Sequence, residues 1–396
     1  MIDILKISSI FLIILFLLRK KLNIGYVMFI AAFVLFLLYR MSLNSIWNTC
    51  KDAALNSATI KLILALTFIR IFEMILREHT VLANMMRAVK TIFKNRKIIA
   101  ASMPLLIGLL PSVGGAYFSA PMVDEATRDT KMTLEEKGFT NYWLRHPWEY
   151  ILPLYPGILL ASAISKIGLH NLIIVNLSYA IFTTITGFIF GMQEVKGVMK
   201  TEDRLSKEGI WSFIPITAVL LLVVIFHMEL HYALIAAVTA LFFFYRYNLK
   251  AILSCLKHGF SLEIIILILS VMLFKEAMEA SGAVKNVSQF FMKGGIPTLP
   301  ILFLLPFVTG LLTGITIGFV GSTFPLILSM VDNTSMGTIS FAFASGFLGV
   351  LLSPVHICLI LTREYFKADL WGMYKMIIPA SLIVFCVAIV EYLILK

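Results

Sequence analysis

The stretch LIGLLPSVGGAYFSAP, residues 106–121, lies in one of the most apolar parts of the sequence. It nevertheless contains two prolines, a pair of glycines, two serines and a tyrosine, which are residues that interrupt helices or form hydrogen bonds. Irregular backbone at membrane depth is tolerated only where protein buries it or where it lines a wet cavity. We therefore expect this stretch to form a turn inside the protein that contributes to a binding site.

The composition around the stretch is typical of a membrane protein. Of 396 residues, 60% are hydrophobic and only 14% are charged, and the mean hydropathy is +0.93, whereas about 25% of the residues in a soluble domain are charged. The net charge is +11, but the basic residues lie in short segments between apolar runs, which indicates topology and not nucleic-acid binding. The four cysteines have no CxxC or paired spacing, so the sequence predicts neither a disulfide framework nor a structural zinc.

Two apolar runs, 98–123 and 294–331, are broken by proline and glycine. The segments beside the first run, 77–97 and 128–145, hold six and four Lys or Arg residues, and both favour the cytoplasm. A re-entrant hairpin leaves both segments on one side, which a simple crossing cannot do. Ten other segments have the length of single spans: residues 3–18, 22–39, 58–76, 143–165, 170–190, 210–226, 229–246, 260–280, 336–362 and 372–395.

With both broken runs as hairpins, 22 of the 33 basic residues lie in cytoplasmic loops. This assignment predicts a multi-pass protein of the cell membrane with both termini outside the cytoplasm.

The chain also repeats itself. PLLIGLL (104–110) recurs as PFVTGLL (306–312), and HPWEYIL (146–152) lines up with SPVHICL (353–359). Five crossings in each half insert the second copy upside down. We expect an all-α polytopic membrane protein with two inverted repeats, each of five transmembrane helices and one re-entrant helical hairpin. Its parts are a first repeat, 1–192, with hairpin 97–126, a cytoplasmic linker, 193–209, and a second repeat, 210–396, with hairpin 295–331.

Such paired discontinuous segments in inverted repeats indicate a secondary transporter. Hairpin tips leave free peptide groups near the bilayer midplane, where amides favour anions and carbonyls favour cations. Alternatively, glycines 310, 314 and 318 form a face for close helix packing, and some hydroxyls cap helix ends. The residues expected to bind substrate or ion are Ser112, Gly114, Gly115, Tyr117, Ser119, Thr313, Gly314, Thr316, Ser322 and Thr323.

Two ionisable residues occupy matched places in the repeats. Glu149 and His356 each stand two residues after a proline, Pro147 and Pro354. Ionisable groups at membrane depth are costly and usually functional, so both are candidates for coupling or protonation. An alternative for Glu149 is an interfacial position in an aromatic belt. The histidines of HMELH (227–231) lack a third ligand nearby, so we predict no metal site.

The combination of PSVGGAYFSAP (111–121) with SPVHICLILTREYF (353–366) resembles the ion transporter superfamily, which includes permeases for gluconate, citrate, dicarboxylates and arsenite. It is most similar to an uncharacterised family of prokaryotic integral membrane proteins in that group. The resemblance implies a homodimer with a scaffold and a mobile part that carries both hairpins in an elevator-type movement. It also implies cation-coupled transport of small anions. Dicarboxylate carriers have a Ser-Asn-Thr signature at the tips, and residues 112–114 and 313–315 depart from it because they contain no asparagine.

We therefore expect a secondary active transporter, not an enzyme, that moves a small anion, an organic acid or oxyanion, coupled to H⁺ or Na⁺. It would need no cofactor beyond that coupling ion and no nucleic-acid partner. Alternatives are a cation/proton antiporter without an organic substrate, an intramembrane enzyme acting on lipid, and a structural or assembly protein. The sequence contains no HExxH or GxSxG motif to support the enzyme, and a structural protein leaves the two broken segments without a purpose.

Overall fold

The computed structural model describes residues 2–20, 22–111, 115–198, 207–283, 286, 297–331 and 335–395. Within these ranges every regular element is a helix, and the β-type pairing is an isolated bridge between Asn95 and Val198. Expected residues Ser112 and Gly114 lie outside the described ranges.

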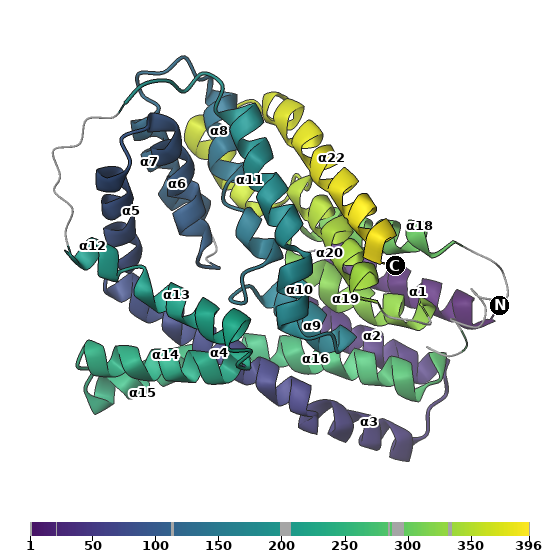
Figure 1. The fold of residues 1–396 in the computed structure, drawn as a ribbon. Coiled ribbons are helices and arrows are strands. Elements are labelled where there is room, and N and C mark those ends of the chain that lie inside the picture. The colour runs from purple at the N-terminus through teal and green to yellow at the C-terminus, as the bar shows by residue number, and fades with distance from the viewer. Residues whose placement is uncertain are drawn as a thin grey trace.

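The helices form two layers, and each layer takes helices from both halves of the chain (Figure 1). In one layer, drawn across the bottom of Figure 1, α2 packs against α16 and α4 packs against α14. Its helices are α1 (Ile2–Arg19), α2 (Ile24–Leu38), α3 (Leu43–Leu55), α4 (Ser57–Glu78), α14 (Leu230–Phe244), α15 (Leu249–Gly259) and α16 (Leu262–Ala280).

The second layer lies above the first in Figure 1 and contains most of the broken helices. From the first half it takes α6 (Arg96–Gly108), α7 (Gly115–Ala126), α8 (Leu134–Trp143), η1 (Pro147–Tyr150), α9 (Pro156–Ser165), α10 (Leu169–Val175) and α11 (Leu177–Gly191). From the second half it takes α18 (Thr298–Thr313), α19 (Thr316–Met330), α20 (Met336–Leu351), α21 (Ile357–Phe366) and α22 (Leu370–Leu395). Four further elements are α5 (Val81–Ile92), α12 (Lys207–Trp211), α13 (Ile214–Leu220) and η2 (Leu221–Ile225). α5 contacts α4 of the first layer, α6 of the second layer and α12, whereas α13 and η2 contact α14.

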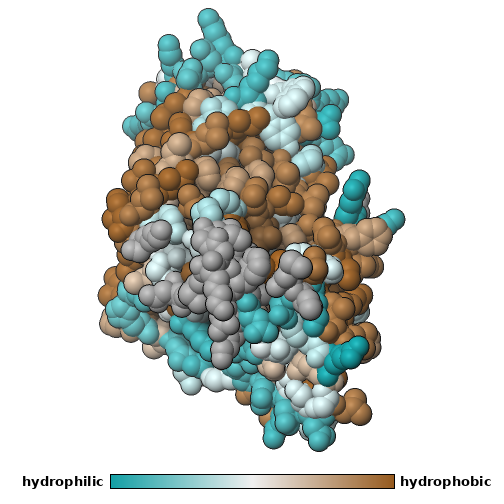
Figure 2. Space-filling view, turned by 90° about the vertical axis from the view of Figure 1, so that its right-hand side faces the viewer, coloured by the Kyte–Doolittle hydropathy of each residue, from teal (hydrophilic) through white to brown (hydrophobic). Residues whose placement is uncertain are grey.

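Length and exposure indicate a membrane protein. Among the residues that the structure describes, three helical stretches are long and apolar enough to cross a bilayer: Leu169–Gly191, Glu208–Ile225 and Leu370–Leu395; the bent pair α15–α16 is a fourth candidate. Large apolar side chains such as Phe243, Phe244 and Trp371 are at least 70% exposed. One face carries a broad apolar area between hydrophilic margins (Figure 2). Such an area is unfavourable in water and favourable in lipid.

Eight of the ten expected spans coincide with a helix or a run of adjoining helices. The prediction of single helices over 143–165 and 336–362 was wrong. The first segment is interrupted between α8 and α9, where Pro147, Pro153 and Pro156 follow one another, and the second is interrupted between α20 and α21 at Pro354. Proline lacks the amide hydrogen that a continuing helix needs, so both segments break.

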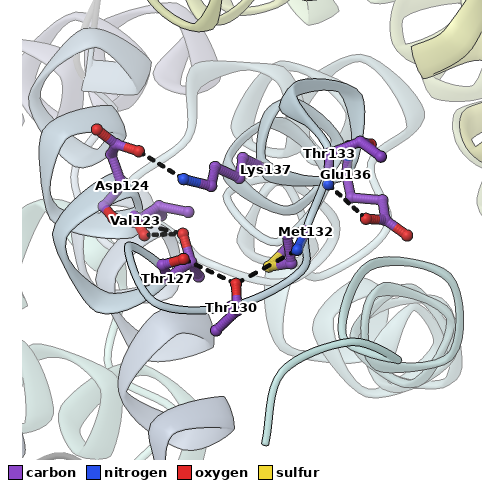
Figure 3. A network of polar contacts seen from close by, with 8 residues as sticks. All are labelled: Val123, Asp124, Thr127, Thr130, Met132, Thr133, Glu136 and Lys137. Atoms are coloured by element: carbon purple, nitrogen blue, oxygen red, sulfur yellow. Dashed lines mark hydrogen bonds and ion pairs between the residues drawn. The ribbon is translucent and has the colours of Figure 1, made fainter.

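The expected cytoplasmic loop 128–145 is also largely helical. Thr133 accepts a hydrogen bond from the Glu136 amide at 3.2 Å, and Glu136 accepts one from the Thr133 amide at 2.8 Å, a capping box that starts α8. Lys137 on this helix pairs with Asp124 on α7 at 2.7 Å (Figure 3). Of the four basic residues in this segment, Lys137 therefore belongs to a packed helix and not to a loop.

Candidate functional site

The first broken segment turns back on itself. α6 ends at Gly108, α7 begins at Gly115, and the two helices pack against each other. Arg96, the first residue of α6, lies 3.5 Å from Asp129, just beyond α7. Both outer ends of the segment therefore lie together.

Residues 144–155, between α8 and α9, cover the end of α6. The Trp148 indole donates to the Leu105 carbonyl at 2.7 Å, and the Tyr155 hydroxyl donates to the Gly108 carbonyl at 2.7 Å. A Cβ atom on Gly108 would lie 2.3 Å from the Arg145 carbonyl oxygen. These bonds satisfy carbonyls that the end of a helix leaves unpaired, and the contact requires glycine.

The second broken segment has a similar arrangement. α18 ends at Thr313, Gly314 has a left-handed φ of 65°, and α19 begins at Thr316. Ser353, between α20 and α21, donates to the Leu311 carbonyl at 2.7 Å, and the His356 Nδ1 lies 2.7 Å from the Gly314 carbonyl. In the first half, residues between α8 and α9 therefore bind the end of α6. In the second half, residues between α20 and α21 bind the end of α18 in the same way.

The two breaks meet in the interior. His146 Nε2 lies 3.1 Å from His356 Nε2 and 3.8 Å from Glu149 Oε1, and Arg145 donates to Cys358 Sγ at 3.1 Å. All five residues are buried, with 8% or less of their surface exposed. We refer to Arg145, His146, Glu149, His356 and Cys358 as the central cluster.

Neighbouring side chains tie the cluster to both broken segments. The Asn141 amide donates to the Ala116 carbonyl on α7 at 2.9 Å and to Thr362 on α21 at 3.0 Å. The side chain of Thr316, the first residue of α19, lies beside the Glu149 carboxyl group. The start of α19 also packs closely on α9, since a Cβ atom on Gly157 would lie 2.8 Å from Thr316.

The hydrogen bonds fix the tautomers of the two histidines. His146 Nδ1 lies 2.6 Å from the Tyr142 carbonyl, and His356 Nδ1 lies 2.7 Å from the Gly314 carbonyl. A carbonyl only accepts, so each Nδ1 must carry the hydrogen. In the neutral rings both Nε2 atoms then present lone pairs to each other, and a cation between them removes that repulsion.

Four of the expected residues lie at the cluster: Glu149, His356, Gly314 and Thr316. Gly310, in contrast, packs on α20, where a Cβ atom would lie 2.1 Å from the Gly346 carbonyl, as the alternative interpretation predicted for that glycine.

The other described candidates lie along the helices. Tyr117 is 53% exposed and packs edge-on against Tyr365, whereas Gly115, at the start of α7, is buried. Four hydroxyls donate to carbonyls of their own helices, which leaves only their lone pairs for a ligand; they belong to Ser119, Thr313, Ser322 and Thr323.

The sequence interpretation did not select Arg145, His146 or Cys358. Arg145 lies in a charged segment that the sequence predicts to be a loop, and Cys358 has no second cysteine near it in sequence. The available signal was the His356-x-Cys358 spacing together with a basic pair directly before Pro147 in the matching stretch of the first half.

A surface groove of the described residues lies elsewhere. It has a volume of about 720 Å³ and is lined mainly by apolar residues of α13 and α14, together with His79 and Glu208. Its lining lacks the charged groups that converge at the central cluster, which is therefore the better candidate for ion or solute chemistry.

Comparison with known proteins gives a family and no function. No curated protein matches the chain. The model of a family described as "Protein of unknown function (DUF401)" matches residues 4–395. Since this match covers nearly the whole sequence, the chain belongs to that family.

Proposed function

We propose that this protein is a secondary active transporter that moves a small anion, an organic acid or an oxyanion, coupled to H⁺ or Na⁺. The observation that carries the proposal is the convergence of two broken helix pairs, one from each half of the chain, on a buried cluster of ionisable side chains. Broken helices that meet at buried polar groups are the usual architecture of substrate sites in such carriers.

The proposal includes the finer topology. We infer that α6–α7 and α18–α19 are re-entrant hairpins of two inverted repeats, with both chain termini outside the cytoplasm. The ion pair between Arg96 and Asp129 supports this for the first segment. The two layers support it further, because each takes equivalent helices from both halves, as a scaffold and a mobile transport part of an elevator-type carrier would.

An anion is favoured by the groups that point toward the centre. Arg145 supplies a buried positive charge. The helices that begin there, α9, α19 and α21, start at Tyr155, Ile315 and His356 without a side-chain cap. Uncapped helix starts carry free amides and partial positive charge, which stabilise an anion.

A coupling cation is favoured beside Glu149 and His356. The carboxylate and the inward-facing imidazole nitrogen lie in the same buried cluster as Arg145, so a cation and an anion bound there would partly neutralise each other. Such mutual dependence is what cotransport requires, because each ligand then raises the affinity for the other.

The test uses purified protein in proteoliposomes. A thermal-shift screen against organic acids and oxyanions identifies a stabilising anion, and its labelled form is then assayed for uptake under pH and Na⁺ gradients. We expect Glu149→Gln and His356→Ala to abolish or uncouple uptake, while Glu364→Gln and His258→Ala on exposed positions leave it unchanged. Full uptake by both cluster variants contradicts the assignment.

The second candidate is a cation/proton antiporter without an organic substrate. The nitrogen, sulfur and carboxylate donors of the cluster favour it, because they are cation ligands. A dye-reported pH change that depends on Na⁺ alone, with no stabilising anion in the screen, would replace the anion carrier with this function.

The resemblance adds two further parts to the proposal: membership of the ion transporter superfamily and a homodimer. Light scattering of the purified protein, corrected for bound detergent, gives the mass of the protein alone and so distinguishes a dimer from a monomer.

A further inference from the structure

We propose that His146, His356 and Cys358, with Glu149 as fourth ligand, form a site for one divalent transition metal ion of the zinc type. The donor atoms of the two histidines and the cysteine all lie within 4.8 Å of one another. In tetrahedral zinc sites, metal–nitrogen bonds of about 2.0–2.1 Å place two ligand nitrogens about 3.3 Å apart. The observed separation of 3.1 Å between the Nε2 atoms matches that geometry.

The groups around the ligands orient them for a metal. Metal-binding histidines commonly donate the other ring N–H to a backbone carbonyl, which fixes the ring and its tautomer. His146 and His356 both do so, toward the carbonyls of Tyr142 and Gly314. The two free nitrogens therefore point their lone pairs at the same small volume.

Cys358 and Glu149 supply the negative charge that such an ion needs. The Arg145 guanidinium donates to Cys358 Sγ at 3.1 Å and stabilises charge on the sulfur, which binds metals as the thiolate. Glu149 Oε1 lies 3.8 Å from His146 Nε2, so a small side-chain movement brings it into coordination. All four ligands are buried, as are those of structural metal sites.

The donor set selects the metal. Imidazole and thiolate prefer zinc, cobalt, nickel and copper, whereas Mg²⁺, Ca²⁺ and other hard cations prefer oxygen ligands. The ligands come from both halves of the chain, with 210 residues between the two histidines. A bound ion therefore joins the break after α8 to the break before α21.

The experiment titrates Co²⁺ into metal-stripped, detergent-purified protein and records the absorption spectrum. We expect a near-ultraviolet thiolate-to-cobalt band that saturates at one Co²⁺ per chain, disappears when Zn²⁺ is added, and is not affected by Mg²⁺. Zn²⁺ should also raise the unfolding temperature of the wild type.

Variants identify the ligands. Cys358→Ser should abolish the thiolate band, and His146→Gln should weaken Co²⁺ binding by at least about 100-fold, since even outer-shell losses cost about 10–100-fold. Glu149→Gln should weaken binding but leave the band. The matched controls are Cys255→Ser, a buried cysteine on α15, and His258→Ala, an exposed histidine on the same helix.

The inference is overturned if the wild type gives no thiolate band, or if the band survives in Cys358→Ser or is lost in Cys255→Ser. Circular dichroism and gel filtration establish that each variant is folded, and Glu149→Gln tests the site in a chain that retains both histidines and the thiol. Metal binding is measured without a transport assay, so its outcome is independent of the proposed function.

Discussion

The two halves of the molecule build their breaks in the same way but from different residues. In the first half, the end of α6 is held by the indole of Trp148 and the phenol of Tyr155. In the second, the end of α18 is held by the small hydroxyl of Ser353 and the imidazole of His356. Both arrangements satisfy the last carbonyls of a buried helix, which are costly to leave unpaired.

The charges at the centre are divided unequally. The break of the first half contributes Arg145, His146 and Glu149, whereas the break of the second contributes His356 and Cys358. The first half therefore supplies the guanidinium and the carboxylate. The second supplies polarisable ligands and a glycine turn. The two breaks therefore share a backbone arrangement but differ in side-chain chemistry.

The largest expected effect tests this division of charge. Replacing Arg145 by Gln removes the buried positive charge, and losing one charged hydrogen-bonding partner in a desolvated site costs about 2–5 kcal/mol. We expect anion uptake in proteoliposomes to fall at least about 30-fold.

Cys358→Ala removes the partner that Arg145 contacts in the second half and should reduce uptake less. If Cys358→Ala reduced anion uptake as much as Arg145→Gln does, the two halves would contribute equally to anion binding. The proposed division of charge between the halves would then be wrong. Arg145→Lys, which keeps the charge but not the planar donor geometry, should give an intermediate rate.

The next effect concerns the glycine turn. Gly314 has a φ of 65°, and a Cβ atom there would lie 3.0 Å from the backbone of His356. Gly314→Ala should therefore combine about 1–2 kcal/mol of left-handed strain with about 1–3 kcal/mol of crowding.

Gly282→Ala is the matched control, because Gly282 has a φ of 74° and no neighbour within 4 Å. The unfolding temperature of Gly282→Ala in detergent should fall less than that of Gly314→Ala, because Gly282→Ala adds left-handed strain but no crowding. Equal falls in unfolding temperature for the two variants would mean that Gly314 does not pack tightly against the backbone of His356.

The sequence predicts where helices end better than it predicts which distant residues contact each other. The pattern of PLLIGLL and PFVTGLL identified the ends of α6 and α18, whereas the second pair of breaks, beside Glu149 and His356, was wrongly predicted as two continuous spans although prolines mark both places. These signals are local, since proline and glycine act on the backbone where they stand.

The pairing of Arg145 with Cys358, and of His146 with His356, was not predictable in the same way. Each pair is more than 200 residues apart in sequence, and neither residue of a pair indicates its partner. Arg145 also follows a segment rich in charge, where basic residues ordinarily mark a cytoplasmic loop. The capping box of Thr133 and Glu136 was the local sign that a helix, and not a loop, precedes it.

A smaller effect compares the two carbonyl caps directly. Trp148→Phe removes the donor to Leu105, and Ser353→Ala removes the donor to Leu311. An orphaned buried acceptor costs about 1–3 kcal/mol, so both variants should lower the unfolding temperature by similar amounts. Tyr365→Phe, which removes a hydroxyl near the surface, is the control. A loss in only one variant would show that the two breaks are not energetically equivalent.

The smallest effect lies at the polar outer end of α8, away from the cluster. Glu135 accepts a hydrogen bond from the Asp369 amide at 3.1 Å, and this bond lowers the pKa of the Glu135 carboxyl group below its usual value. A lowered pKa in the folded protein adds stability above the pKa of the unfolded chain, and that stability is lost as the pH falls through the folded pKa. Glu135→Gln should therefore lower the unfolding temperature slightly at neutral pH, because Glu135 is only half-buried and solvent screens its interaction. In acid the variant should have no effect, because the protonated carboxyl group is neutral like the amide of Gln. Glu364→Gln, at an exposed position of α21, should show no such pH dependence. If the variant and the wild type still differed in unfolding temperature in acid, the effect of Glu135 would come from packing. The contact between Glu135 and Asp369 would then not depend on charge, unlike the contacts of the central cluster.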